Sequence, residues 1–178
     1  HRYKNRILFL HTTHCPVRCR FCFRKNILAA DGPFAAGATP DREFFNYLSD
    51  HPEIEEVIFT GGDPFMLDYQ KLQSYLESLS TISSIKYIRF HTRTPVVLPE
   101  RITPAFCALL EVWYSRFPIM TVAIHINHAS ELDSEVVASL NLLKKSGVQL
   151  LSQTVLLRGI NDNLPYLKTL FMALSNLH

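Results

Sequence analysis

Residues 57–64 read VIFTGGDP and residues 68–79 read DYQKLQSYLESL, and this pair of stretches indicates how the chain folds. The first is a short apolar run that stops at two glycines, which is typical of a buried strand followed by a turn. The second places leucines at helical spacing behind Asp68, a residue type that caps helix N-termini. We therefore predict a strand over residues 57–60 and a helix over residues 69–79.

The same strand-then-helix pattern occurs five times along the chain. Runs typical of strands cover residues 7–10, 57–60, 85–91, 120–126 and 148–154. Helical periodicity covers residues 41–49, 69–79, 103–114, 134–146 and 164–177. This alternation predicts an α/β fold with a parallel sheet, and polar residues at the end of every strand favour a site at the carboxyl edge. Polar ends on five strands favour a TIM-barrel-like curl of the sheet, but five strands are too few to close a barrel.

Length and charge limit the classes of function. The 178 residues suit one domain with a real core, and we expect residues 1–178 to form it. The formal net charge is only +2, which provides no basic surface for nucleic acid or for an anionic membrane. No apolar run approaches the roughly 20 residues that span a bilayer, and the stretch from His1 to Arg6 with the run after it lacks the long apolar region and the small-residue cleavage site of a signal peptide. We expect a cytoplasmic protein.

Three cysteines follow the first predicted strand with the spacing C-x3-C-x2-C: Cys15, Cys19 and Cys22. Three thiolates in such a run can hold three irons of a cubane iron–sulfur cluster and leave the fourth iron open. The alternative is a zinc-stabilised, non-enzymatic binding module in which His11 or His14 completes the ligand set. A second cysteine clip is missing, which favours the cluster. The distant Cys107 lies in a helical pattern and is expected to be buried.

The stretch Thr60-Gly61-Gly62-Asp63-Pro64 supplies a second motif. Two glycines after a strand permit a close approach of a ligand to the backbone, although a tight turn alone would also explain them. Together with the cysteine run, this motif resembles the radical S-adenosylmethionine (SAM) superfamily. The resemblance implies a [4Fe-4S] cluster on the three cysteines, SAM on its open iron, and an external electron donor. It also implies that Gly61, Gly62 and Asp63 lie along the methionyl part of SAM.

A longer series of motifs narrows the resemblance. In order, the chain reads HRY at 1–3, CFR at 22–24, HTRTPVVLPERI at 91–102, HINH at 125–128 and VLLRGIND at 155–162. The series resembles the lysine 2,3-aminomutase family, including the branch that acts on a lysine of elongation factor P. This family implies an isomerase that moves the α-amino group of free or protein-bound lysine to the β-carbon. The family uses a 5′-deoxyadenosyl radical and a pyridoxal phosphate imine. A radical SAM enzyme of another reaction type is the alternative.

The resemblance also implies roles for substrate-binding residues. Arg24 matches the arginine that pairs with the substrate carboxylate, for which a planar guanidinium is well suited. Asp162 matches the aspartate that pairs with the distal ammonium of lysine. The expected partners are therefore lysine or a lysyl side chain, with elongation factor P as a candidate, and the family suggests a homo-oligomer.

The same resemblance assigns cofactor contacts. Tyr3 and Arg6 match positions that contact pyridoxal phosphate, and Asn127 and Gln153 end strands on the expected functional edge, as does His128. The lysine that carries pyridoxal phosphate in the family is expected after a sixth strand, and no lysine of this chain has that context. The resemblance therefore implies an incomplete, TIM-barrel-like (βα)6 radical SAM core, a fragment that lacks the last strand and the C-terminal segment with the pyridoxal phosphate lysine; a natural truncation is the alternative.

Overall fold

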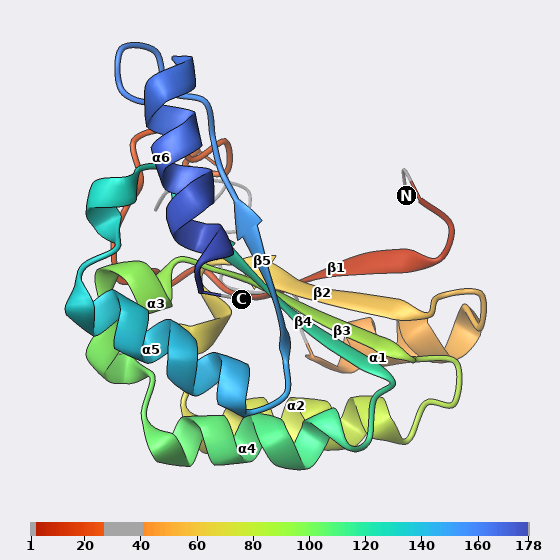
Figure 1. Cartoon of the computed structure of the whole chain (residues 1–178). Helices are drawn as coiled ribbons and strands as arrows, with labels where there is room; N and C mark the ends of the chain where they lie inside the picture. The colour runs from red at the N-terminus through yellow and green to blue at the C-terminus, as the bar shows by residue number, and fades with distance from the viewer. Residues whose placement is uncertain (1–2, 27–40, 178) are drawn as a thin grey trace.

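A computed structural model describes residues 3–26 and 41–177, and Figure 1 shows them arranged around one sheet. The sheet is parallel throughout, and its strand order follows the chain, β1-β2-β3-β4-β5. The strands are β1 (Arg6–Thr12), β2 (Glu56–Gly61), β3 (Tyr87–Thr92), β4 (Ile119–His125) and β5 (Gln149–Gln153). The predicted α/β class and parallel sheet are confirmed. Within the described residues the sheet is open, as in a partial barrel.

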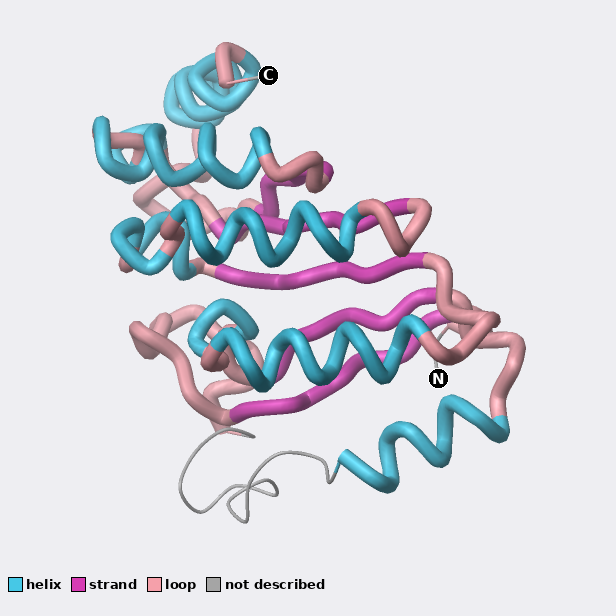
Figure 2. Tube along the Cα trace, turned by 90° about the horizontal axis from the view of Figure 1, so that it is seen from below, coloured by secondary structure: helices cyan, strands magenta, loops and turns pink. Residues whose placement is uncertain are grey.

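The connections are helical, and Figure 2 shows helices lying across one face of the sheet. The longer helices are α1 (Asp41–Asp50), α2 (Tyr69–Ser80), α4 (Pro104–Tyr114), α5 (Ser134–Lys145) and α6 (Leu164–Ser175). Short turns of helix were not predicted: α3 (Thr94–Val97) and the 3-10 segments η1 (Pro64–Met66), η2 (Pro99–Arg101) and η3 (Ala129–Glu131). As predicted, Asp68 caps α2 through the backbone N–H of Lys71. Gly147 follows the end of α5 with a positive φ.

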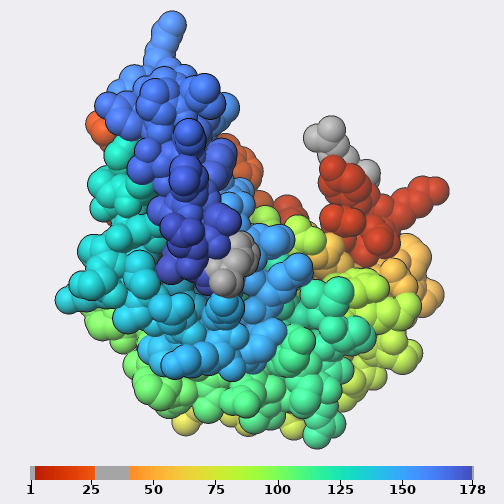
Figure 3. Space-filling view, viewed as in Figure 1, coloured from red at the N-terminus to blue at the C-terminus, as the bar shows by residue number. Residues whose placement is uncertain are grey.

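The hydrophobic core lies between the sheet and helices α1, α2, α4 and α5, where side chains of alternate strand residues meet the helices. Phe9 of β1 stacks on Phe44 of α1 with ring centroids 3.9 Å apart. Cys107 is buried in the same core, as predicted. The opposite face of the sheet is less covered, since Leu8 and Leu151 are 45% and 43% exposed there. Figure 3 shows a hollow above this face, bounded by α6 and by the N-terminal segment.

His11 lies among the core aromatics, next to the rings of Phe9, Phe59 and Tyr75. Its Nδ1 is 3.2 Å from the backbone oxygen of Phe9. Burial lowers the pKa of His11 from 6.5 to about 4, so the imidazole is neutral in the folded protein at neutral pH. This position also keeps His11 on the core side of the sheet, where it does not serve as a zinc ligand.

We predict that His11 makes the protein less stable in acid. Below pH 6.5 the imidazole of His11 is protonated in the unfolded chain but stays neutral in the folded chain. The free energy of unfolding therefore falls as the pH drops from about 6.5 to about 4. One pKa unit corresponds to about 1.4 kcal/mol, so the loss from His11 is on the order of 3 kcal/mol. Urea unfolding at pH 7 and pH 4.5 measures it. His11→Phe should reduce this pH dependence, whereas Phe106→Leu, a substitution in the same core that removes no titratable group, should leave it unchanged. Equal pH dependence in all three proteins would contradict the prediction.

No helix within residues 3–26 and 41–177 has the length and apolar character needed to cross a membrane.

Candidate functional site

A pocket of about 250 Å³ lies at the carboxyl edge of the sheet. Its walls come from the loop after β1, the glycine turn after β2 and the ends of β3, β4 and β5. It brings together eight of the predicted site residues: Cys15, Cys19, Cys22, Arg24, Gly61, Gly62, Asp63 and Gln153. The sequence predicted this edge because polar residues end every strand there.

The three cysteines form one wall of the pocket, and none is in a disulfide. The loop turns tightly between the last two, since the N–H of Cys22 donates to the backbone oxygen of Cys19 at 3.0 Å. Burial, followed by the nearby charge of Asp63, raises the pKa of the Cys15 thiol to about 11, and the other two cysteines add to the effect. The thiols are thus close enough to interact electrostatically, and ligand binding there would have to displace protons.

The same thiols do not surround one point in space. In the part of the chain that the structure describes, no three His, Cys, Asp or Glu side chains are grouped closely enough to hold a single metal ion. Structural zinc requires four ligands around one ion, whereas a cubane cluster spreads its ligands over separate irons. Three cysteines in one pocket wall can supply the three protein ligands of a cubane cluster.

The glycine turn packs directly on the cysteine loop. The N–H of Gly62 donates to the backbone oxygen of Thr12 at 2.7 Å, and the N–H of Asp63 donates to that of His14 at 2.8 Å. A Cβ on Gly62 would lie 2.3 Å from the oxygen of His14, and Gly61 has a φ of +102°. The glycines are thus required by the close approach of the cysteine loop, a role that the sequence did not reveal.

Asp63 is buried, and hydrogen bonds occupy its carboxylate. Oδ1 accepts from Thr92 Oγ1 at 2.6 Å and from the N–H of Phe65 at 3.1 Å. Oδ2 accepts from the backbone N–H groups of Arg93 at 2.7 Å and Thr94 at 3.1 Å. The side chain therefore fastens the end of β3 to the glycine turn, and its predicted contact with SAM stays a prediction.

Arg24 faces the pocket from the cysteine loop. Its Nη1 donates to Thr60 Oγ1 at 2.5 Å, and its Cζ lies 4.6 Å from the ring centroid of Phe23. Burial lowers the pKa of Arg24 from its ordinary value, because the pocket removes water from the guanidinium. A half-buried guanidinium of this kind suits a carboxylate ligand.

Two histidines in the pocket wall were not predicted as site residues. The Nε2 atoms of His91 and His125 are buried without a hydrogen-bond partner among the described residues. Burial, followed by the charge of Arg89 and then of Arg24, lowers the pKa of His91 to about 4, and burial also lowers that of His125. Both open motifs of the family resemblance and lie near strand ends, but neither signal says where a side chain points.

The structure places five predicted residues outside this pocket: Tyr3, Arg6, Asn127, Asp162 and His128. Tyr3 and Arg6 stack on each other at the amino end of β1, with the Arg6 Cζ 4.9 Å from the ring centroid, and Arg6 pairs with Glu56 at 3.4 Å. Asn127 is buried and accepts the N–H of Val155 at 2.8 Å. These contacts are structural, and the cofactor roles stay predictions.

Asp162 and His128 make local contacts in loops. The exposed Asp162 accepts the N–H of Gly159 at 2.9 Å, so its pairing with a substrate ammonium stays a prediction. His128 caps η3 through the N–H of Ser130.

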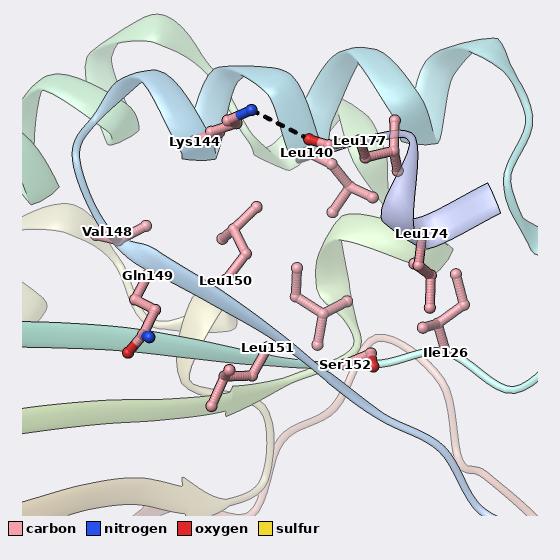
Figure 4. A pocket seen from close by; sticks show the side chains of 11 residues that line it. Ile126, Leu140, Lys144, Val148, Gln149, Leu150, Leu151, Ser152, Leu174 and Leu177 are labelled. Atoms are coloured by element: carbon pink, nitrogen blue, oxygen red, sulfur yellow. Dashed lines mark hydrogen bonds between the residues drawn. The ribbon is translucent and has the colours of Figure 1, made fainter. Parts of the chain in front are cut away.

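A second pocket, of about 390 Å³, lies between β5, α5 and the end of α6 (Figure 4). Its lining is mostly leucine, isoleucine and valine, and Lys144 at its rim donates to the backbone oxygen of Leu177 at 3.3 Å. The lining offers few groups for chemistry, so the pocket beside the cysteines is the candidate site.

The sequence is similar to proteins of known name. The chain is 41% identical to the L-lysine 2,3-aminomutase of Buchnera aphidicola over 173 residues, which cover 95% of this chain and 48% of the relative. It is 40% identical to the proteins of the same name from Haemophilus influenzae and Escherichia coli, over 96% and 98% of this chain and 49% of each relative. The chain thus spans about half the length of the curated relatives it matches. A model of the radical SAM superfamily matches residues 9–165, and the chain therefore belongs to that superfamily.

Proposed function

We propose that this chain is the radical-generating core of an isomerase of the lysine 2,3-aminomutase type, which moves the α-amino group of lysine to the β-carbon. The observation that carries the proposal is the interlocking of the cysteine loop with the glycine turn in one pocket, with Arg24 in its wall. The family and the similarity to named L-lysine 2,3-aminomutases support it.

Cys15, Cys19 and Cys22 would hold the [4Fe-4S] cluster. When bound, the cluster and SAM supply one electron and a carbon radical that abstracts hydrogen, chemistry that no side chain provides. The chain's own residues would do the positioning. Gly61 and Gly62 keep the cysteine loop against the sheet, and Asp63 fixes the end of β3 beside it.

Arg24 would bind the substrate carboxylate. Its guanidinium is partly desolvated and is held by Thr60 and the ring of Phe23, so little side-chain freedom is lost when a carboxylate binds. The orientation would present the substrate's backbone end to the cluster side of the pocket. The other end of lysine would point away from Arg24, and Asp162 is proposed to reach it on the strength of the family resemblance.

Pyridoxal phosphate is proposed for the whole protein from the family resemblance. The described residues do not assemble a site for it, because Tyr3 and Arg6 lie at the amino end of β1 and Arg6 is paired with Glu56. Of the proposed cofactor contacts on the sheet, Gln153 lines the pocket and Asn127 does not.

The test uses the full-length protein, reconstituted anaerobically with iron and sulfide. We expect bound iron and acid-labile sulfide, and release of 5′-deoxyadenosine from SAM when a reductant is present. With pyridoxal phosphate, L-lysine or a lysyl residue of elongation factor P should yield the β-isomer, and comparing the two substrates decides between free and protein-bound lysine. Zinc alone, with no iron or sulfide, would refute the proposal.

Arg24→Met is predicted to weaken substrate binding without affecting the cluster. Loss of a charge-assisted hydrogen bond costs about 1.5–3 kcal/mol, which corresponds to roughly a 10- to 100-fold increase in KM. Iron content should stay at the wild-type level. Lys25→Met, an exposed neighbour in the same loop, is the control and should change neither quantity. An equal loss of iron and of substrate binding in Arg24→Met would contradict the assigned role.

A further inference from the structure

Arg93 connects the cysteine loop to a distant part of the chain. Its Nη1 donates to the sulfur of Cys19 at 3.1 Å, and its Nη2 donates to Glu131 Oε2 at 2.9 Å. The Cζ also lies 5.3 Å from the ring centroid of Phe21. The side chain is only 19% exposed, so these contacts form in a partly desolvated place where hydrogen bonds to charged groups are strong.

Both ends of this connection are fixed by other contacts. The backbone N–H of Arg93 donates to the buried carboxylate of Asp63 at 2.7 Å, which anchors the main chain directly after β3. Glu131 uses its other oxygen, Oε1, to accept the backbone N–H groups of Asn127 at 2.9 Å and His128 at 3.0 Å. The guanidinium is therefore held in place before any ligand binds, with one arm aimed at the sulfur.

An arginine is needed for this geometry. The planar guanidinium serves two acceptors at once through separate nitrogen atoms, whereas a lysine ammonium is a single point charge on a flexible stem. Arg24, the other arginine that lines the pocket, donates instead to Thr60. Arg93, by contrast, donates to a cysteine sulfur.

We propose that Arg93 is a positioning residue for the cluster: its hydrogen bond holds Cys19 in place and raises the reduction potential of the cluster. The proposal rests on the proposed function, because it takes Cys19 as a cluster ligand. Reduction adds one electron to the cluster and places more negative charge on its sulfur ligands. A cationic donor at such a sulfur stabilises the reduced form more than the oxidised form, and hydrogen bonds to cluster sulfurs are a known determinant of potential.

The experiment uses the full-length protein with its cluster reconstituted, and it does not depend on turnover. Iron and sulfide content and the midpoint potential, followed by electron paramagnetic resonance during reductive titration, are measured for wild type, Arg93→Met, Arg93→Lys and Arg20→Met. Arg20 is the matched control, because it is an exposed arginine in the same loop, directly after Cys19. In Arg93→Met we expect the ratio of reduced to oxidised cluster at a fixed potential to fall at least tenfold, equivalent to about 59 mV for one electron. Arg93→Lys should fall in between, and Arg20→Met should stay within about twofold of wild type.

The outcomes separate the two proposals. A wild-type potential in Arg93→Met at full iron content would overturn the role of Arg93 and leave the proposed function intact. If Arg93→Met fails to retain iron, Arg93→Lys decides, and a wild-type potential there also overturns the proposal. If the wild-type protein holds no iron–sulfur cluster, the proposed function fails first and the role of Arg93 fails with it. An equal shift in Arg20→Met would attribute the effect to loop charge and would count against the hydrogen bond.

Discussion

Cys22→Ser is expected to reduce cluster iron and SAM cleavage to background in the full-length protein. Serine is nearly isosteric, but its hydroxyl is a hard, weakly acidic ligand that replaces a soft thiolate poorly on iron. Changes to the groups behind metal ligands typically cost about 10- to 100-fold in metal affinity, so loss of a ligand itself should exceed about 100-fold. Iron and sulfide analysis and the yield of 5′-deoxyadenosine measure the effect.

The matched control is Cys107→Ala. Cys107 is 7% exposed within α4, packs in the core and does not line the pocket. Its removal should leave iron content and SAM cleavage unchanged, with a modest loss of stability from a small cavity. Iron loss in Cys107→Ala equal to that in Cys22→Ser would show that a general loss of folding, rather than loss of a ligand, explains the result. Full iron retention in Cys22→Ser would remove Cys22 from the ligand set.

The fold was predictable because its signals are local. Leucines at helical spacing behind Asp68 and the apolar run before Gly61 each specify one element without knowledge of the rest of the chain. Parallel pairing follows from their alternation, since a helix between strands returns the chain to the same edge. The short turn α3 was missed because Thr94 and Pro95 give no periodic pattern over four residues.

The site was predictable only in part. The cysteine spacing and the glycine turn are short motifs, and their meeting follows from the pairing of β1 with β2. By contrast, the contact between Arg93 and Cys19 joins residues 74 positions apart, and it depends on where along the sheet each strand ends. No local pattern predicts that the carboxylate of Asp63 accepts hydrogen bonds from Thr92 at the end of β3 and from the two residues after it. Likewise, matching Arg6 to a motif could not show that Glu56 holds its guanidinium.

Gly62→Ala is expected to displace the cysteine loop and with it the cluster. The added Cβ would lie 2.3 Å from the oxygen and 2.7 Å from the nitrogen of His14, which are backbone atoms one residue before Cys15. The loop cannot move aside without weakening the 2.8 Å hydrogen bond from Asp63 to His14. Such overpacking costs about 1–3 kcal/mol, occasionally more, and against a rigid backbone neighbour we expect the upper end of that range. Iron content after reconstitution should fall severalfold or more.

Gly159→Ala separates this steric effect from the general cost of replacing a glycine. Gly159 has a φ of +72°, which an alanine adopts at a cost of about 1–2 kcal/mol, yet nothing lies within 4 Å of the added Cβ. In a urea titration Gly159→Ala should lose part of the free energy of unfolding that Gly62→Ala loses, while iron content falls only in Gly62→Ala. Because Gly159→Ala is also destabilised but leaves the cysteine loop in place, its full iron content would show that loss of stability alone does not remove the cluster. If Gly62→Ala binds iron as well as Gly159→Ala does, the close approach of the glycine turn is a feature of folding and has no part in holding the cluster.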